Sequence, residues 1–131
     1  MAEPLLLDTS PIIAHLRGRI NIVQLISPQS WAFTSYVTVG ELLKGVHKAE
    51  DPMKERTKVD AFLALVSVVM PDKETTEIYG RIAADLEVQG QRIPANDTWI
   101  AAMALQAGMT LATGDDHFKR VPNLKLVQWT W

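Results

Sequence analysis

The sequence has no cysteine, no long hydrophobic segment and no excess of basic residues. Because none of its 131 residues is Cys, its fold must be stable without disulfides, and this length suffices for one hydrophobic core. An N-terminal signal of basic and then apolar residues is missing, and no apolar run approaches the length that spans a bilayer. These absences predict a protein of a bacterial-type cytoplasm without a membrane segment.

The charge balance limits the kinds of partner. Lys and Arg number 13 against 15 Asp and Glu, for a formal net charge of −2. This argues against a protein that coats nucleic acid through a broad basic face, but not against a small active site that acts on a phosphodiester. Hydrophobic residues at 47% and charged residues at 21% are typical of a globular protein. With no internal repeat or low-complexity tract, residues 1–131 are expected to form a single domain.

Apolar runs alternate with helical patterns along the chain. The run "PLLLD" is typical of a buried strand, and the "TSP" after it is typical of a helix start. Further strands are expected at residues 31–38, 66–70, 109–113 and 124–129. Helices are expected at residues 38–49, 53–66, 72–90 and 97–108, with two short helices on either side of Gly18. The expected fold class is α/β, a three-layer α/β/α domain whose central, mostly parallel sheet has about five strands.

Acidic side chains occur where the predicted strands end. Asp8 ends the first strand, Glu41 follows the second, and Asp115 with Asp116 follows the fourth. Asp97 begins a later helix and shares that helix's inward apolar stripe. Because the carboxyl ends of parallel strands form one rim, where ligands bind in such folds, we expect these acids to converge.

A cluster of unpaired carboxylates is unfavourable, since each negative charge raises the pKa of the others. A hard divalent cation such as Mg²⁺ or Mn²⁺ accepts oxygen ligands and would turn this repulsion into binding. Water bound to such an ion is more acidic and can attack a phosphorus atom. The acids therefore favour a metal site for phosphodiester chemistry.

Each acid also has a purely structural interpretation. Asp8 could help to cap the next helix, although the two hydroxyl residues after it already supply cap oxygens. Thr38 and Glu41 have the spacing of a capping box, and Asp97 could favour the dipole of its own helix. The segment "TGDDHF" could be a plain turn. Only the joint placement of the acids supports the metal site.

Four segments together resemble the PIN domain, and in particular the VapC-like ribonuclease toxins of prokaryotic toxin–antitoxin pairs. They are "LLLDTSPIIAHLRG", "SYVTVGELLKG", "IPANDTWIAAMALQAG" and "LATGDDHFKRVPNLKLVQW". None of them is specific alone, but the set of four in this order is. The resemblance extends from the first strand to the last, while residues 48–80 match only in helical character.

The resemblance implies a ribonuclease that depends on Mg²⁺ or Mn²⁺. Its catalytic acids would be Asp8, Glu41, Asp97 and Asp115. The metal would be held by Asp8, Asp97 and Asp115, with Glu41 either a further ligand or the group that polarises the attacking water. Hydrogen bonds that orient these carboxylates would come from Thr9, Ser10 and Thr113. Asp116 ranks below Asp115, although the doubled acid leaves the choice open. The family also implies an RNA substrate, a cognate antitoxin whose C-terminal segment blocks the acids, and a homodimer.

Other polar and aromatic residues are weaker candidates. Lys44 and Arg92 could contact RNA phosphate, although Lys44 is also placed to pair with Glu41. His117 is interpreted as a loop residue, because three scattered histidines show no metal-ligand spacing. The four tryptophans could stack on bases. Of these, Trp31 and Trp99 are expected to pack in or against the core, and Trp129 and Trp131 to lie on the surface.

Two other classes of protein compete with the nuclease. A PIN-like domain that no longer cuts could serve as an interaction module, but the presence of all four acids argues against it. A receiver-type phosphoacceptor domain would need paired acids after the first strand, an acid after a central strand and a lysine after a late one. Here "LLLDTS" has one acid and "VSVVMPDKE" lacks that pattern.

Overall fold

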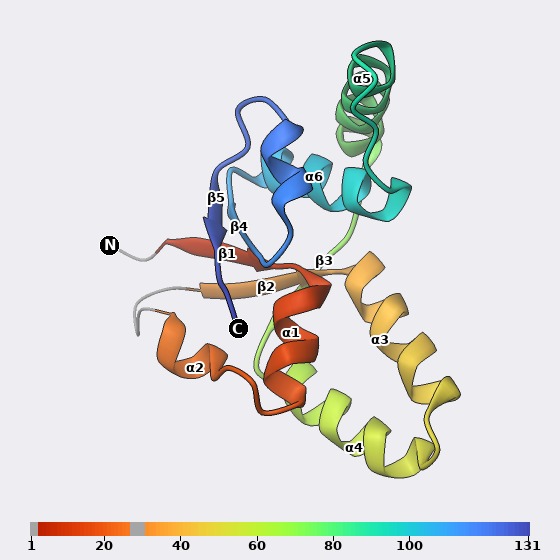
Figure 1. Ribbon diagram of the computed structural model, residues 1–131, viewed down its shortest axis with the longest axis vertical. Coiled ribbons are helices and arrows are strands. Elements are labelled where there is room, and N and C mark those ends of the chain that lie inside the picture. The colour runs from red at the N-terminus through yellow and green to blue at the C-terminus, as the bar shows by residue number, and fades with distance from the viewer. Residues whose placement is uncertain (1–2, 27–30) are drawn as a thin grey trace.

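The computed structural model describes residues 3–26 and 31–131, whose strands form one sheet (Figure 1). The strands are β1 (Pro4–Leu7), β2 (Trp31–Ser35), β3 (Ser67–Val69), β4 (Thr110–Thr113) and β5 (Leu126–Gln128). Their order across the sheet is β3-β2-β1-β4-β5, and all neighbouring strands are parallel. The predicted α/β class with a parallel central sheet is confirmed.

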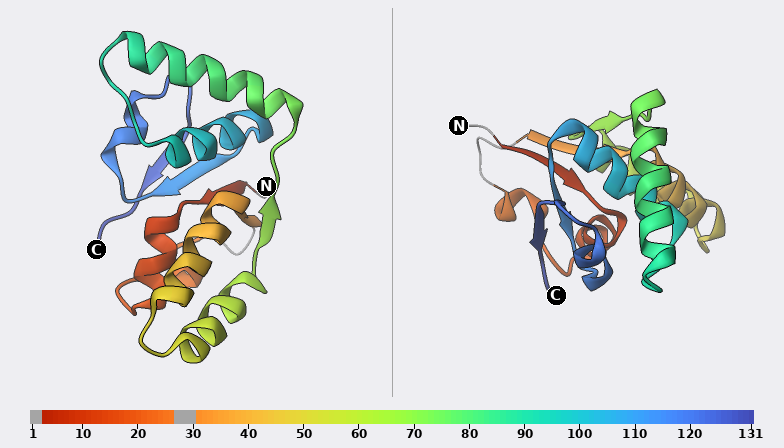
Figure 2. Two further views of the ribbon diagram at one scale, coloured as in Figure 1. Left: turned by 90° about the vertical axis from the view of Figure 1, so that its right-hand side faces the viewer. Right: turned by 90° about the horizontal axis from the view of Figure 1, so that it is seen from above.

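Helices cover both faces of this sheet, which gives the three predicted layers (Figure 2). One layer contains α1 (Thr9–Leu16), α2 (Ile22–Leu25), α3 (Tyr36–Lys48) and α4 (Pro52–Leu63). The other contains α5 (Lys73–Val88), α6 (Ala95–Ala107) and the short 3-10 helix Asp116–Arg120. Leu6 packs in the core beneath α5 and α6, and Leu7 in the core beneath α1 to α4. Successive strand residues point to opposite faces, so an unbroken leucine run supplies both cores.

Helix ends follow local sequence signals in several places. Asp72 begins α5 with a capping box, in which its Oδ1 accepts from the backbone N–H of Thr75 and Thr75 Oγ1 accepts from the backbone N–H of Asp72. Gly108 ends α6 in the left-handed conformation, with φ of 66°, as its position in the sequence predicts. Within the described residues, no helix has the length and apolarity needed to cross a membrane.

The second strand is shorter than predicted, because residues 31–38 divide at Ser35. The Oγ of Ser35 accepts a 3.1 Å hydrogen bond from the backbone N–H of Thr38, which starts α3 at Tyr36. Thr38 is therefore a buried residue inside the helix, and the capping-box interpretation of Thr38 and Glu41 is wrong. Glu41 lies in the second turn of α3 rather than the first.

The tryptophans differ from one another in their surroundings. Trp99 stacks on Tyr79 with ring centroids 4.0 Å apart and packs against the core, as expected. Trp31 is 65% exposed at the start of β2, so the expectation that it packs against the core is wrong. Trp131 is exposed, as predicted, but Trp129 is partly buried and packs against the core beneath α1 to α4, so the expectation that it lies on the surface is wrong.

The order of strands reverses at β1. The chain adds β2 and β3 on one side of β1 and then crosses over to add β4 and β5 on the other. In open parallel sheets, ligands bind outside the carboxyl ends of the strands at such a switch point. Asp8 follows β1 directly and Asp115 comes two residues after β4, so the fold brings both acids to this point.

Candidate active site

Asp8 is held rigidly at the carboxyl edge of the sheet. Its backbone N–H donates to the carbonyl oxygen of Ala112 at 2.9 Å, which extends the pairing of β1 with β4 by one residue. The residue is only 2% exposed, and its Oδ2 accepts a 2.7 Å hydrogen bond from Oγ1 of Thr113. The backbone of Asp8 continues β1, and its carboxylate is oriented by Thr113 of the neighbouring strand β4.

Burial raises the pKa of Asp8 from its ordinary value of 3.8 to about 6. Hydrogen bonds from Thr113 and from the backbone N–H of Thr9 lower this pKa because they favour the charged form, while the charges of Asp97 and Asp115 raise it. An acid that ionises reluctantly among other acids marks a place where a cation would bind favourably.

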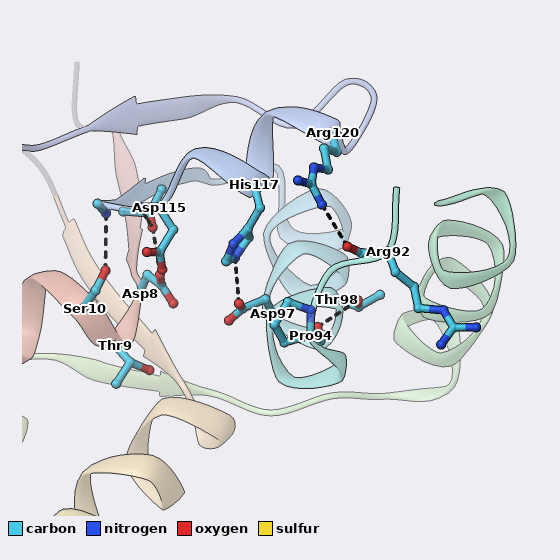
Figure 3. Close-up of polar contacts among 12 residues, drawn as sticks. Asp8, Thr9, Ser10, Arg92, Pro94, Asp97, Thr98, Asp115, His117 and Arg120 are labelled. Carbon is cyan, nitrogen blue, oxygen red and sulfur yellow. Dashed lines mark hydrogen bonds and ion pairs between the residues drawn. The ribbon is translucent and has the colours of Figure 1, made fainter. Parts of the chain in front are cut away.

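The loop after β4 is tied to Asp8 on one side and to α1 on the other. The backbone N–H of Asp115 donates to Thr113 Oγ1 at 3.0 Å, and the backbone N–H of Gly114 donates to Ser10 Oγ at 3.3 Å. Figure 3 shows the carboxylates of Asp8 and Asp115 side by side. Thr113 thus contacts both acids, while Ser10 anchors the residue between Thr113 and Asp115.

Asp97 reaches the same region from the first turn of α6. Its Oδ2 lies 2.7 Å from Nε2 of His117, on the 3-10 helix, and the side chains are only 16% and 26% exposed (Figure 3). The contact is an ion pair when His117 is protonated, and its geometry is not that of an aligned hydrogen bond among the described residues. Burial raises the pKa of Asp97 most strongly, His117 opposes this, and the charges of Asp115 and Glu41 add to it.

Glu41 faces the site from α3 and is partly buried. Its Oε1 accepts a 2.8 Å hydrogen bond from Oγ1 of Thr9, the first residue of α1, and this hydroxyl also lies 3.0 Å from Oγ1 of Thr38. The hydroxyl that Glu41 binds belongs to the residue directly after Asp8, and the charge of Glu41 adds to the raised pKa of Asp97. All four predicted catalytic acids are therefore brought to one edge of the sheet.

Asp116 has other partners outside this cluster. Its Oδ1 accepts a 2.8 Å hydrogen bond from Nε2 of Gln128 and lies 3.3 Å from Nζ of Lys119. These contacts hold the pKa of Asp116 below its usual value, and its side chain is exposed. Of the doubled acids, only Asp115 contributes to the charges that act on Asp8 and Asp97.

The two predicted RNA-contact residues differ in their surroundings. Arg92 pairs with Glu87 at 3.0 Å on the surface, and Figure 3 shows its side chain directed away from Asp97. Lys44 is exposed, one turn after Glu41, and forms no ion pair with any residue in 3–26 or 31–131.

The donor set suits a divalent cation. Asp97, Asp115 and His117 each offer a ligand atom, and these atoms lie within 4.8 Å of one another. Carboxylate oxygens suit Mg²⁺ and Mn²⁺, and an imidazole nitrogen is an acceptable ligand for a transition metal. The pKa values of Asp8 and Asp97 are raised by burial and by neighbouring acids, and a bound cation would favour the charged form of both carboxylates. The residues present therefore fit a divalent metal ion.

His117 is the member of this group that sequence reasoning assigned to a loop. It lies two residues after Asp115, and the single 3-10 turn from Asp116 to Arg120 directs it toward Asp97. The sequence contained one sign that His117 could belong to the site, which is its position two residues after Asp115. The spacing of the three histidines gave no such sign.

Comparison with known proteins identifies the family of this chain. The profile of the PIN domain matches residues 5–124, which includes all four acids and the strands β1 to β4 apart from Pro4. The chain belongs to the PIN-domain family. The resemblance seen in the four sequence motifs is thereby confirmed.

Individual relatives of this PIN domain match along almost their full length. Ribonuclease VapC2 of Rickettsia felis is 31% identical over 129 residues, covering 95% of this chain and 96% of its own. Ribonuclease VapC1 of Haemophilus influenzae is 30% identical over 130 residues, covering 95% and 97%.

Solved structures also match this PIN domain closely. A chain of VapBC2 from Rickettsia felis, crystallised with a DNA fragment from its promoter, has a TM-score of 0.91 at 27% identity, covering 97% of this chain and 99% of that one. A chain of VapBC-1 from nontypeable Haemophilus influenzae has a TM-score of 0.87 at 29% identity, covering 96% and 98%.

Proposed function

We propose that this PIN domain is an endoribonuclease that hydrolyses RNA phosphodiester bonds with the help of Mg²⁺ or Mn²⁺. The observation that carries the proposal is the convergence of Asp8, Asp97 and Asp115 at the switch point of the sheet, where burial and mutual repulsion raise the pKa of two of them. Support also comes from the similar VapC2 chain, which is named a ribonuclease.

The chain's own groups have distinct roles in this proposal. A divalent ion, when bound, supplies a more acidic water and offsets charge on the phosphate oxygens. Asp97 and Asp115 would hold the ion together with Asp8, and His117 would offer a further donor beside Asp97. Glu41, kept in place by Thr9, polarises the attacking water and accepts its proton. The water oxygen forms a bond to phosphorus while the bond to the opposite, leaving oxygen breaks, and that oxygen takes up a proton from solvent.

We further propose that the chain is the toxin of a cytoplasmic toxin–antitoxin pair and works as a homodimer. The support is its similarity to the VapC2 chain and to a chain of the VapBC2 crystal structure. A C-terminal segment of the antitoxin would cover the acids. Expression of the chain alone should arrest growth, and coexpression of the neighbouring open reading frame should relieve the arrest. Light scattering of the purified protein measures whether its mass is that of a dimer.

The decisive experiment is cleavage of a mixed RNA pool by the purified domain. Cutting is expected with Mg²⁺ or Mn²⁺, and it should stop with EDTA and in the variants Asp8→Asn and Asp97→Asn. Asp116→Asn is the matched control, because Asp116 is an exposed acid near the site whose contacts are with Gln128 and Lys119. Its cutting should match that of the wild type.

A negative result would have a definite meaning. If no RNA is cut and calorimetry detects no binding of either metal, the ribonuclease proposal is wrong and a PIN-like interaction module takes its place. If Asp116→Asn loses activity as completely as Asp8→Asn, the assignment of roles among the acids is wrong.

A further inference from the structure

A small pocket lies beside the acidic site, on the other side of the loop that carries Asp115. Its volume is about 220 Å³, and it is lined by Ser10, Ile13, Ala14, Arg17, Arg19 and Trp131. Sites for drug-sized ligands usually have volumes of roughly 300–1,000 Å³, so this one suits a single planar group. No Asp or Glu side chain lines it, and two of its six lining residues are arginines.

The two arginines of the pocket are held without an acidic partner. Neither Arg17 nor Arg19 forms an ion pair with another residue in 3–26 or 31–131. Their backbone is fixed at the end of α1, where Arg17 N–H donates to Ile13 O at 3.0 Å and Arg19 N–H donates to Ala14 O at 2.9 Å. Gly18 between them has φ of 74°, the left-handed conformation that makes this tight turn possible. The backbone of both arginines is therefore fixed beside the pocket, and neither guanidinium group has an ion-pair partner among the described residues.

Trp131 connects the pocket to the acidic site. Its indole ring packs directly on Gly114, so closely that a Cβ at that position would collide with it. Gly114 lies between Thr113, which contacts Asp8, and Asp115. The residue as a whole is still 46% exposed, so Trp131 is not enclosed by its contact with Gly114.

Arg17 lies between this pocket and a second cavity on another side of α1. Besides this pocket, it lines a second cavity of about 340 Å³ between α1, α3 and α4, which also contains Glu41. A single arginine therefore faces both the pocket of Trp131 and the cavity that opens at one of the four acids. The same cavity is also lined by Lys58 and by a second acid, Glu55.

We propose that Trp131, Arg17 and Arg19 bind one nucleotide of the RNA substrate next to the bond that is cut, an inference that rests on the proposed ribonuclease activity. The base stacks on the indole, and the neighbouring phosphate is held by the guanidinium groups. This combination favours RNA over an acidic peptide, because a peptide carboxylate would satisfy the arginines but leave the aromatic face without a matching planar group. The pocket would therefore help to position the substrate and select the base beside the cut.

The test is the steady-state cleavage of a short random-sequence RNA with Mn²⁺ by the variants Arg17→Gln, Arg19→Gln, Trp131→Ala and Trp131→Phe. Loss of stacking in Trp131→Ala should raise KM roughly tenfold with kcat within about twofold, whereas Trp131→Phe should keep most of the affinity. In parallel, fluorescence anisotropy with the same labelled RNA in EDTA measures binding without cleavage. Each arginine variant should reduce the slope of log affinity against log salt by about 0.7, as loss of one phosphate contact predicts.

Two matched controls separate this pocket from general effects of charge and aromatic surface. Trp31→Ala removes an exposed tryptophan at the opposite, amino-terminal end of the strands, and Arg81→Ala removes an exposed arginine of α5. Both should keep the wild-type KM and salt slope. Thermal melts of all variants identify any that fail to fold, and the arginine variants test the pocket independently of Trp131.

The outcomes distinguish the pocket from the proposed activity. If the wild type cuts RNA and the variants have unchanged KM, affinity and salt slope, the pocket proposal is overturned while the ribonuclease proposal stands. If the wild type binds RNA through these residues but never cuts it, the activity fails and the pocket stands. If the variants bind and cut RNA like the wild type but no longer bind the protein encoded by the neighbouring open reading frame, the pocket is a binding site for that protein. The RNA proposal is then overturned. If RNA is neither bound nor cut, both proposals fail.

Discussion

Thr113 donates a 2.7 Å hydrogen bond to Asp8, across a separation of 105 residues in sequence and between two neighbouring strands. The same hydroxyl accepts the backbone N–H of Asp115 at 3.0 Å. One side chain thereby sets the direction of a buried carboxylate and the start of the loop that carries the next acid. The geometry of the site is built into the pairing of β1 with β4.

Replacement of Thr113 by Val should destabilise the protein by about 1–3 kcal/mol, because it leaves a buried carboxylate and a backbone N–H without their partner. The same change should weaken metal binding about tenfold or more, since the hydroxyl orients Asp8. Urea unfolding and calorimetry measure the two effects. Thr110→Val is the control, because Thr110 is in the same strand but its hydroxyl bonds Glu3 at the exposed end. Equal losses in both variants would contradict the special role of Thr113.

The stability of the metal-free protein should depend on the ionisation of Asp8. Burial raises the pKa of Asp8 from 3.8 to about 6. The folded protein is therefore most stable, with respect to this group, below about pH 4, where Asp8 is protonated in both the folded and the unfolded state. This contribution to the free energy of unfolding is lost as the pH rises through about 6. The shift corresponds to at most about 3 kcal/mol. Asp8→Asn should therefore be more stable than the wild type by about 1–3 kcal/mol near pH 8 and equally stable near pH 4.

Urea unfolding in EDTA at both pH values checks this prediction. Asp116→Asn is the comparison, because the pKa of this exposed acid is lowered rather than raised, and it should show no gain at the higher pH. A destabilised Asp8→Asn near pH 8 would show that the hydrogen bond from Thr113 outweighs the cost of burying the charge.

The positions of Asp8 and Asp115 could be predicted from sequence because strand ends are the strongest local signals in the chain. The leucine run stops at Asp8, and "TLAT" stops just before the doubled acid. Once the strands are parallel, their carboxyl ends must share an edge, and convergence follows without knowledge of any side-chain contact. The same logic predicted the three layers.

Other features depended on contacts that periodicity does not encode. The segment around Ser35 is rich in β-favouring residues, yet one hydroxyl cap turns it into helix and moves Glu41 to the second turn. The choice between Asp115 and Asp116 is made by Gln128 and Lys119, which hold the second acid elsewhere. A sequence pattern cannot show which of two adjacent acids finds a distant partner.

Binding of a divalent ion should stabilise the protein strongly near pH 8, because it relieves repulsion among acids whose pKa values are raised. At a free ion concentration about 100 times the Kd, the gain is about 2.7 kcal/mol, and EDTA should remove it. Asp115→Asn should lose most of this gain, because Asp115 offers a ligand atom close to those of Asp97 and His117. Asp116→Asn should keep it. Thermal melts with Mn²⁺ and Mg²⁺ measure the effect, and an equal response of the two variants would contradict the placement of the acids.

His117 should hold down the pKa of Asp97, since its charge and its contact at 2.7 Å both favour the ionised carboxylate. His117→Gln removes this opposing influence, so burial and the charges of Asp115 and Glu41 should raise the pKa of Asp97 further above its ordinary value. Carboxyl-carbon NMR titration of the metal-free protein follows Asp97 directly.

The control for this titration is His47→Gln, which removes an exposed histidine near the end of α3 and should leave the midpoint of Asp97 unchanged. Metal affinity should fall about tenfold in His117→Gln if the imidazole is a ligand or orients Asp97, and stay constant in His47→Gln. An unchanged or lower midpoint for Asp97 in His117→Gln would mean that the ion pair does not form in solution. The raised pKa of Asp97 would then come from its burial and its acidic neighbours alone.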